Sequence, residues 1–266
     1  MSNIVITGST KGFGLALAKI FLKFGDSVVI CSRNEDRVDK ALKNLKQLYS
    51  NDSVYGVKCD ITQKENVENL GQFALENLGS IDIWINNAGI SSAGDKPLVD
   101  TSEENIRTII NTNLIGTLFG CQVALGIMLK QKFGKIFNLE GLGSDGRVVP
   151  NVIPYISTKA AIPMVTKTLT KELKNSNILV NNIHPGMMVT DLILKGMSSE
   201  SKLINILAEL PITVAEKMVP IMKNIKKTGK RIKFSKGSKI FIRFMTSWRF
   251  KNRFMDKNGN LLIEIE

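Results

Sequence analysis

Short apolar runs rich in β-branched residues alternate along this chain with longer stretches whose apolar residues recur at helical spacing. A repeat of about 3.6 residues predicts amphipathic helices, and short apolar runs predict strands that are buried on both faces. Strands separated by helices form right-handed βαβ units and therefore a parallel sheet. We thus expect an α/β fold with a single doubly wound sheet covered by helices on both faces. The expected strands are residues 3–7, 27–31, 54–59, 81–86, 134–139 and 178–183.

Length and composition agree with one globular unit of this kind. The chain has 266 residues, of which 43% are hydrophobic and 23% charged, so disorder and a coiled coil are excluded. No apolar run reaches the roughly 18 residues that a bilayer-spanning helix needs, and we expect no membrane span. The chain enters the apolar run at residues 4–6 at once, which leaves no room for a signal or transit peptide. We therefore expect either a cytoplasmic protein that works where it is made, or a sequence that is already mature. The three cysteines form no C-x-x-C pair, so we expect no disulfide scaffold and no metal site.

The net charge of +12 is confined to the C-terminal region. Residues 221–255 carry twelve Lys and Arg and no acid, whereas the rest of the chain has 24 basic and 24 acidic residues. We therefore divide the chain into a domain at 1–220 and a basic amphipathic segment at 221–266. Cations interleaved with bulky apolar residues suit an anionic membrane surface. The alternatives are a solvated basic face over a buried stripe and nucleic acid; we expect no nucleic-acid partner, because no motif for one is present.

A glycine-rich turn follows the first expected strand and leads into a helix. Glycines let the backbone approach a pyrophosphate, and a helix N-terminus offers unpaired N–H groups and partial positive charge. A plain strand–helix turn is the alternative interpretation, but the position directly after strand one favours a nucleotide. The residues expected to bind it are Thr7, Gly8, Ser9, Lys11, Gly12, Phe13 and Gly14.

The ends of the next strands indicate which nucleotide is bound. An acid after strand two would bind the ribose 2′-hydroxyl and select NAD. Arg33 stands there instead, and together with Lys11 it suits a 2′-phosphate, so we expect NADP(H). The alternative for Arg33 is a solvated residue at a helix start. Asp60, after strand three, either bonds the adenine amino group or caps the following helix.

Two further motifs bear on chemistry. Asn87, Ala88 and Gly89 follow strand four and allow a ligand to lie against the chain. Tyr155 and Lys159 are four residues apart in a helical stretch, which puts the phenol and the ammonium on one face, about 6 Å apart at Cβ. A cation beside a phenol favours its ionised form and makes it a usable proton donor. A surface Tyr–Lys pair is the alternative for an isolated motif.

In combination these motifs resemble the short-chain dehydrogenases/reductases. Thr-Gly-x-x-x-Gly-x-Gly, Asn-Asn-Ala-Gly, Tyr-x-x-x-Lys and Pro-Gly occur in the family's order and spacing over residues 3–195. The resemblance implies a Rossmann-type sheet, hydride transfer from a nicotinamide, and a homo-oligomer. It implies that Tyr155 is the general acid, and that Lys159 holds the ribose hydroxyls and lowers the tyrosine pKa. Further positions implied by the resemblance are Asn113, which kinks its helix and orders a relay water, and Pro185, Gly186 and Thr190 beside the nicotinamide.

One part of the family pattern is missing. A serine usually lies 13 or 14 residues before the tyrosine, where it bonds the substrate carbonyl, but Leu142 and Gly141 occupy those positions here. Losing one such donor can cost about 10²–10³ in rate. Ser144 is the nearest hydroxyl. Either Ser144 replaces the donor, or the substrate is positioned another way, or catalysis is lost.

The departure is itself shared with one branch of the family. Residues 138–146 resemble the corresponding segment of chlorophyll(ide) b reductases, which also carry an acid–glycine pair in place of Ser-Ser, and residues 185–192 and 241–254 resemble the same branch. This implies NADPH-dependent reduction of the 7-formyl group of chlorophyll b or chlorophyllide b to 7-hydroxymethyl, by a protein peripheral to a photosynthetic membrane. The alternatives are a reductase for another hydrophobic aldehyde or ketone, and a catalytically weakened NADP-binding regulatory protein. We expect no terminal strand of the usual family type, and His184 is expected only to pack.

Overall fold

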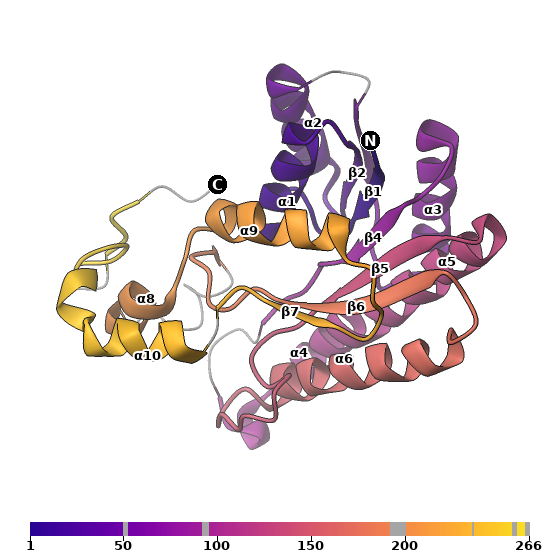
Figure 1. Cartoon of the computed structure of the whole chain (residues 1–266). Coiled ribbons are helices and arrows are strands. Elements are labelled where there is room, and N and C mark those ends of the chain that lie inside the picture. Colours follow the sequence, from indigo (N-terminus) through magenta and orange to yellow (C-terminus); the bar gives the residue numbers. More distant parts are fainter. Residues whose placement is uncertain (50–52, 92–95, 192–200, 236, 257–259, 264–266) are drawn as a thin grey trace.

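Seven parallel strands lie in the order β3-β2-β1-β4-β5-β6-β7 in this computed structural model (Figure 1). The structure describes residues 1–49, 53–91, 96–191, 201–235, 237–256 and 260–263. The predicted α/β sheet is therefore confirmed. The strands are β1 (Asn3–Ile6), β2 (Ser27–Ser32), β3 (Val54–Lys58), β4 (Ile83–Asn86), β5 (Gly134–Leu139), β6 (Ile178–His184) and β7 (Arg231–Lys233).

Helices cover both faces of the sheet (Figure 1). They are α1 (Gly12–Lys23), α2 (Glu35–Leu48), α3 (Lys64–Leu78), α4 (Glu103–Ile110), α5 (Gly116–Gln131), α6 (Ile153–Glu172), α8 (Ser201–Leu207), α9 (Pro211–Asn224) and α10 (Gly237–Met245). Shorter elements are the 3₁₀ turns η2 (Leu98–Asp100) and η4 (Ser247–Phe250) and the π-helix η3 (Asn111–Ile115). Because β1 pairs with both β2 and β4, the strand order reverses there. Such a switch point places a ligand at the carboxyl ends of the strands.

Alternation along the strands divides the core between the two faces of the sheet. Ile4 and Ile6 pack in the cluster with α1 and α9, whereas Val5 between them packs in the cluster on the opposite face, which contains Trp84. These side chains are fully buried. Burial of each aliphatic side chain contributes about 1.5–3 kcal/mol. The strand ends that carry the polar motifs are thus held on a rigid base.

One helical stretch corrects the expectation about membrane spans. Residues Glu103–Gln131, which run through α4, η3 and α5, are long and apolar enough to cross a membrane by length and composition, with a mean hydropathy of 1.5 in their most apolar part. Buried residues of α5, such as Ala124 and Met128, pack in the core over the sheet, in the cluster that also holds residues of α3. The apolar character of this stretch is thus used, in part, to cover the sheet.

The basic C-terminal segment is built into the fold. Helix α9 runs through the expected boundary at 220/221, and β7 continues the sheet beside β6, with Arg231 opposite Asn182. The expectation that the chain has no terminal strand was therefore wrong. The sequence does not reveal β7, because this strand is only three residues long and Ile232 is its one apolar residue. Beyond it, Phe254 and Met255 form a small cluster with Val189 and with residues of α8.

Candidate active site

The glycine-rich turn between β1 and α1 has no room for side chains. A Cβ on Gly8, whose φ is +61°, would lie 2.8 Å from Cα of Ala88, and one on Gly14 would lie 2.4 Å from the Gly8 carbonyl oxygen. Gly12 also has a positive φ of +56°. No side chain among the described residues caps the start of α1 at Lys11. The N–H groups of its first turn are therefore free to hold an anion such as a pyrophosphate.

Several polar residues of the turn hold the loop together. The Asn87 side-chain amide donates to the carbonyl oxygens of Thr7 and Gly8, both at 2.9 Å. The Thr7 hydroxyl accepts from the backbone N–H groups of Asn87 at 3.0 Å and of Ala88 at 3.1 Å. Ser9 Oγ accepts from the Cys31 N–H at 3.0 Å and donates to the carbonyl of Ile6. The side chains of Thr7, Ser9 and Asn87 thus shape the cradle.

Two predicted cofactor residues bond to other side chains of the protein. Lys11 Nζ lies 2.5 Å from Oδ2 of Asp191, which is 180 residues away in sequence. Asp60 Oδ1 accepts from the backbone N–H of Thr62 at 3.0 Å and from its hydroxyl at 2.8 Å, and these bonds close a turn ahead of α3, whose N-cap is Gln63. Arg33 is exposed just after β2. Phe13 is 5% exposed and packs in the core, so only its backbone faces the turn.

Tyr155 and Lys159 lie together on α6, as the four-residue spacing predicts. Lys159 Nζ donates to the carbonyl oxygen of Leu139 at 3.1 Å. Burial lowers the pKa of Lys159 to about 8, and the negative charge of Glu140 opposes that shift. Burial also raises the pKa of Tyr155 to about 12, against a hydrogen bond from the Leu142 backbone that lowers it, so the lowered tyrosine pKa that the resemblance implied is not found. The phenol is therefore protonated at neutral pH, the state that a proton donor needs.

Asn113 occupies the π-helix η3 between α4 and α5, an irregularity that often marks functional sites. Its side-chain oxygen accepts from the Ile90 N–H, and its amide donates to the Ile90 carbonyl, both at 2.8 Å. The amide also reaches the hydroxyl of Thr158 on α6 at 3.3 Å. A Cβ on Gly89 would lie 3.3 Å from the Asn113 side-chain oxygen and 3.6 Å from Lys159 Nζ. Gly89, Asn113 and Lys159 therefore meet at one point.

Gly141, one of the two positions where the family carries its serine, lies tightly against the phenol of Tyr155. A Cβ at Gly141 would lie 2.4 Å from the phenol oxygen of Tyr155, so the phenol occupies the space that a side chain would need. The hydroxyl of Ser144 donates to the Gly141 carbonyl at 2.6 Å and accepts from the Gly141 N–H at 2.8 Å. Its only proton is thus used within the loop, and donation to a substrate would require that bond to break. The Leu142 N–H is the donor that already faces the phenol.

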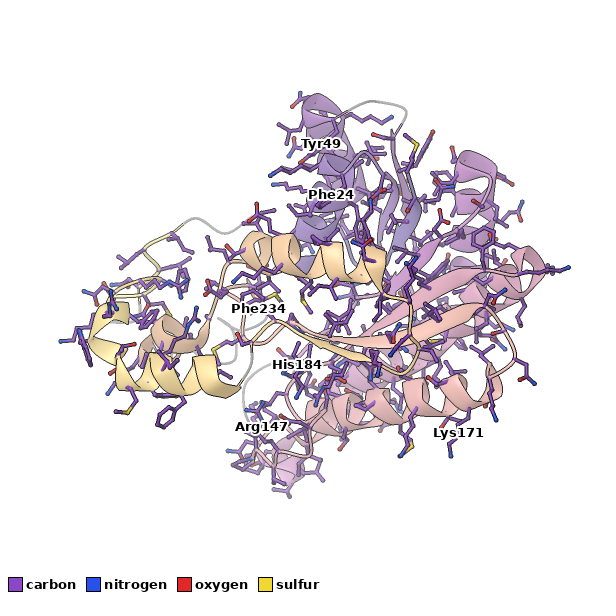
Figure 2. All side chains as sticks on the ribbon, viewed as in Figure 1. Phe24, Tyr49, Arg147, Lys171, His184 and Phe234 are labelled. Atoms are coloured by element: carbon purple, nitrogen blue, oxygen red, sulfur yellow. The ribbon has the colours of Figure 1, made fainter. Side chains whose placement is uncertain are left out.

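A buried charge cluster beside the site was missed by sequence reasoning. Glu140 is 2% exposed, and its Oε2 lies 3.2 Å from Nδ1 of His184 and bonds the guanidinium of Arg231. The sequence carried one signal for it, since an acid directly after a buried strand needs a partner. Figure 2 shows His184 at the end of β6 that faces α8 and α10, beside Phe234, whose N–H donates to the His184 carbonyl at 3.1 Å.

The remaining predicted positions lie after β6. Pro185 is buried, Gly186 has a φ of +78°, and the methyl group of Thr190 would be 3.6 Å from a Cβ on Gly12. Thr190 thus faces the glycine-rich turn. Residues 192–200, which follow these positions, and Lys236 of the basic segment lie outside the described residues.

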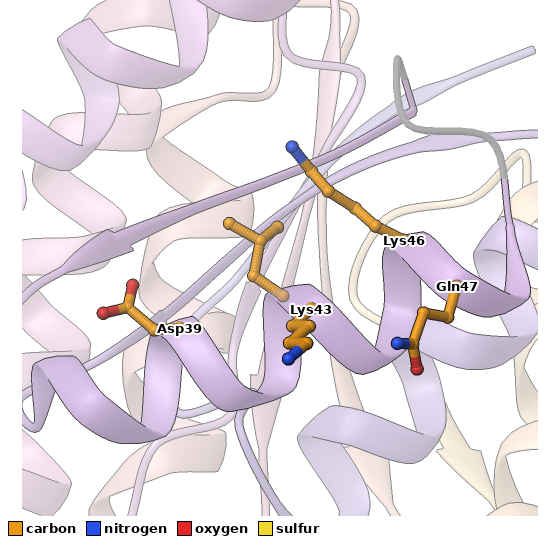
Figure 3. Close-up of a pocket in the computed structure, with 5 residues that line it drawn as sticks. Asp39, Lys43, Lys46 and Gln47 are labelled. Atoms are coloured by element: carbon orange, nitrogen blue, oxygen red, sulfur yellow. The ribbon is translucent and has the colours of Figure 1, made fainter.

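Two other features do not contribute to this site. A surface depression along α2, lined by Asp39, Leu42, Lys43, Lys46 and Gln47 (Figure 3), holds none of the residues gathered around Tyr155. Within the described part of the chain, no three His, Cys, Asp or Glu side chains are placed to hold a metal.

The comparisons with known proteins agree with this geometry. The family model for short chain dehydrogenase matches residues 2–200. A chlorophyll(ide) b reductase, NOL, of Arabidopsis thaliana is 42% identical over 95% of this chain and 76% of its own length. The probable chlorophyll(ide) b reductase NYC1 of the same plant is 40% identical over 99% of this chain, which spans only 56% of that relative. Both relatives are described as chloroplastic.

Solved structures show the same fold. A structure of ElxO with NADP bound has a TM-score of 0.78 and 29% identity, and the match covers 88% of this chain and 96% of that one. An actinorhodin polyketide ketoreductase variant with NADPH has a TM-score of 0.77 and 25% identity, and the match covers 87% and 95% of the two chains.

The Rossmann-type sheet with Tyr155 and Lys159 on one helix beside the glycine-rich turn defines an oxidoreductase that acts on C=O or CH–OH groups. The chain belongs to the short-chain dehydrogenase/reductase family. Within that family it falls in the branch that contains the chlorophyll(ide) b reductases.

Proposed function

We propose that this protein is an NADPH-dependent reductase that converts the 7-formyl group of chlorophyll b or chlorophyllide b to 7-hydroxymethyl. The main support is the sequence identity of 40–42% to proteins named as chlorophyll(ide) b reductases, over 95–99% of this chain. The local geometry supports it, because Gly141, at one of the two positions where the wider family carries a serine, leaves room for the Tyr155 phenol.

Cofactor recognition rests on three features of the chain. The glycines at 8, 12 and 14 allow close backbone approach, the start of α1 offers N–H groups to the pyrophosphate, and Arg33 offers an exposed cation to the 2′-phosphate. The cofactor, when bound, supplies hydride from C4 of its nicotinamide. Lys159 and Asn113 converge where the ribose and nicotinamide are expected.

The side chains then manage the proton. Tyr155, neutral at pH 7, donates its phenol proton to the substrate oxygen as that oxygen becomes negative. The Lys159 ammonium stabilises the phenolate that remains, and the Leu142 N–H helps to hold it. Because Lys159 loses its proton near pH 8, we expect reduction to fall as the pH rises through that value.

Replacing both Arg33 and Lys11 with alanine should weaken NADPH binding about 10-fold or more and change NADH binding less than about threefold. A charge-assisted hydrogen bond to phosphate is worth about 1.5–3 kcal/mol, and NADH lacks that phosphate. Since Lys11 is paired with Asp191, the single Arg33→Ala change should account for most of the loss. The measurement is a titration of nucleotide fluorescence, with the exposed Lys40→Ala as the control. Equal losses for the two nucleotides would show that neither cation recognises the 2′-phosphate.

A panel of carbonyl compounds tests the substrate. Chlorophyllide b should be reduced to its 7-hydroxymethyl product, and chlorophyllide a, which lacks the formyl group, should not oxidise NADPH. Turnover of retinal or a steroid ketone without turnover of the pigment would favour the general reductase. NADPH binding without any turnover would favour the regulatory protein.

We also propose that the outer face of α10 and η4 contacts an anionic membrane surface, where a pigment substrate dissolves. Phe241, Met245 and Trp248 follow one another at helical spacing and are 62–66% exposed. Arg249 and Lys251 are exposed beside them, whereas Arg243 and Arg253 turn inward and pair with Glu209. In Figure 1 this part of the chain projects beyond α8, away from the helices that cover the sheet. Arg249 and Lys251 are thus the exposed cations that can contact lipid headgroups.

Vesicle co-sedimentation tests this surface. The protein should bind vesicles that contain anionic lipid, and the binding should weaken with salt. Changing Arg249 and Lys251 to glutamine should weaken it about tenfold or more, at about 1 kcal/mol for each cation. Changing Lys226 and Lys227 to glutamine is the control, because these exposed lysines follow the C-terminal end of α9 and lie outside α10 and η4. A protein that stays in the supernatant at low salt would contradict the proposal and leave only a solvated basic face.

The remaining proposals concern assembly and location. Homo-oligomerisation, implied by the family resemblance, would cover apolar side chains on α5 and α6 such as Leu129 and Met164, which are 53% and 61% exposed. The chloroplastic relatives favour work at a photosynthetic membrane over the free cytoplasm that the sequence indicated.

A further inference from the structure

Glu140 carries a buried oxygen that no group in the described part of the chain bonds. Its side chain is 0% exposed, and Oε2 pairs with both His184 and Arg231. Oε1 has no hydrogen-bond partner among the described residues. Burial of an ionised carboxylate with a free oxygen is costly, so such a group is expected to serve an electrostatic purpose.

The backbone on both sides of Glu140 contacts Lys159. The carbonyl of Leu139 accepts from Lys159 Nζ at 3.1 Å, and a Cβ on Gly141 would lie 3.2 Å from Lys159 Cγ. The Lys159 side chain is itself buried, at 5% exposure for the residue. Burial favours loss of its proton and lowers its pKa, and Glu140 is the charge that opposes this.

We propose that Glu140 is a positioning residue for the reduction, a buried counter-ion that keeps Lys159 cationic. Arg231 of β7 and His184 of β6 fix this carboxylate from the neighbouring strands. The inference rests on the proposed reductase, in which the Lys159 ammonium holds the ribose and stabilises the Tyr155 phenolate. It also gives the basic C-terminal segment a part in catalysis, since Arg231 belongs to that segment.

The charges around Glu140 and Lys159 predict the direction in which each substitution shifts the titration of Lys159. Glu140 pairs with Arg231 of β7 and His184 of β6, and its charge acts on Lys159, which shares α6 with Tyr155. Glu140→Gln removes the negative charge and keeps the shape. Arg231→Gln removes a positive charge from the far side of the same carboxylate. The two changes should therefore move the titration of Lys159 in opposite directions.

Two pH profiles measure the shift in the titration of Lys159. One is the turnover number with NADPH and chlorophyllide b, and the other is the dissociation constant of NADPH determined by fluorescence. In Glu140→Gln, the alkaline limb of both profiles should move to lower pH by about one unit or more. In Arg231→Gln, it should move to higher pH. Asp26→Asn is the matched control, because Asp26 is also fully buried and paired with a cation of the basic segment, Lys223 at 2.5 Å. It should lower the melting temperature and leave the limb in place.

An alkaline limb that stays in place in Glu140→Gln, or moves the same way in both variants, would overturn the proposal and leave Glu140 a purely structural residue. If Glu140→Gln does not fold, Arg231→Gln decides alone, and a limb that fails to move to higher pH overturns the proposal. The NADPH profile separates this outcome from failure of the proposed substrate. Wild-type protein that shows the shifts in NADPH affinity but reduces no pigment would keep the counter-ion and reject the substrate.

Discussion

Replacing Tyr155 with phenylalanine should lower the turnover number by about 10²–10⁴ and leave NADPH affinity within about threefold of the wild type. A positioned general acid contributes about that factor, and phenylalanine keeps the ring while removing the proton. Burial raises the pKa of the Tyr155 phenol to about 12, so the phenol carries its proton at neutral pH and can donate it. Steady-state reduction and nucleotide fluorescence measure the two quantities separately.

Tyr49→Phe is the matched control for this prediction, because Tyr49 lies at the end of α2 and the change also removes one hydroxyl. It should leave both quantities unchanged. Turnover of Tyr155→Phe within threefold of the wild type would show that the proton comes from elsewhere.

Gly141→Ser, which inserts the residue type found in the wider family, should lower turnover about 100-fold or more. The new Cβ would lie 2.4 Å from the Tyr155 oxygen, and the phenol must move away to relieve the contact. A displacement of about 1 Å at a reacting group can cost 10²-fold. Turnover with chlorophyllide b and NADPH measures the loss, and nucleotide fluorescence confirms that the cradle remains formed.

Gly126→Ser provides the comparison, since a Cβ on this α5 glycine meets open space. It should leave turnover unchanged. A Gly141→Ser protein that is more active than the wild type would mean that the loop tolerates the serine and that the missing donor, not the space, limits the reaction.

The local signals of the sequence were sufficient for the fold and for the two residues on α6. Strand–helix alternation placed six of the seven strands, because each of these carries at least three apolar residues. The spacing of Tyr155 and Lys159 is a property of a single helix and needs no tertiary information. Strand β7 escaped because one apolar residue between two cations has no visible period.

The contacts that the sequence did not indicate join residues far apart along the chain. Lys11 pairs with Asp191, and Glu140 pairs with Arg231, 91 residues later. Neither pair follows from spacing, because only the order of strands in the sheet brings the partners together. The same is true of Gly141, whose significance depends on where the phenol of α6 lies. Absence of the family serine was visible in the sequence, but its steric reason was not.

Transfer of deuterium from NADPH to the pigment tests the central claim most directly. The protein is incubated with chlorophyllide b and NADPH deuterated at C4 of the nicotinamide on both faces, and the product is analysed by mass spectrometry. The account predicts 7-hydroxymethyl product that carries one deuterium on the hydroxymethyl carbon, and at least about 10²-fold slower formation of this product with Tyr155→Phe. Recovery of unchanged chlorophyllide b, with NADPH bound but not oxidised, would contradict the account.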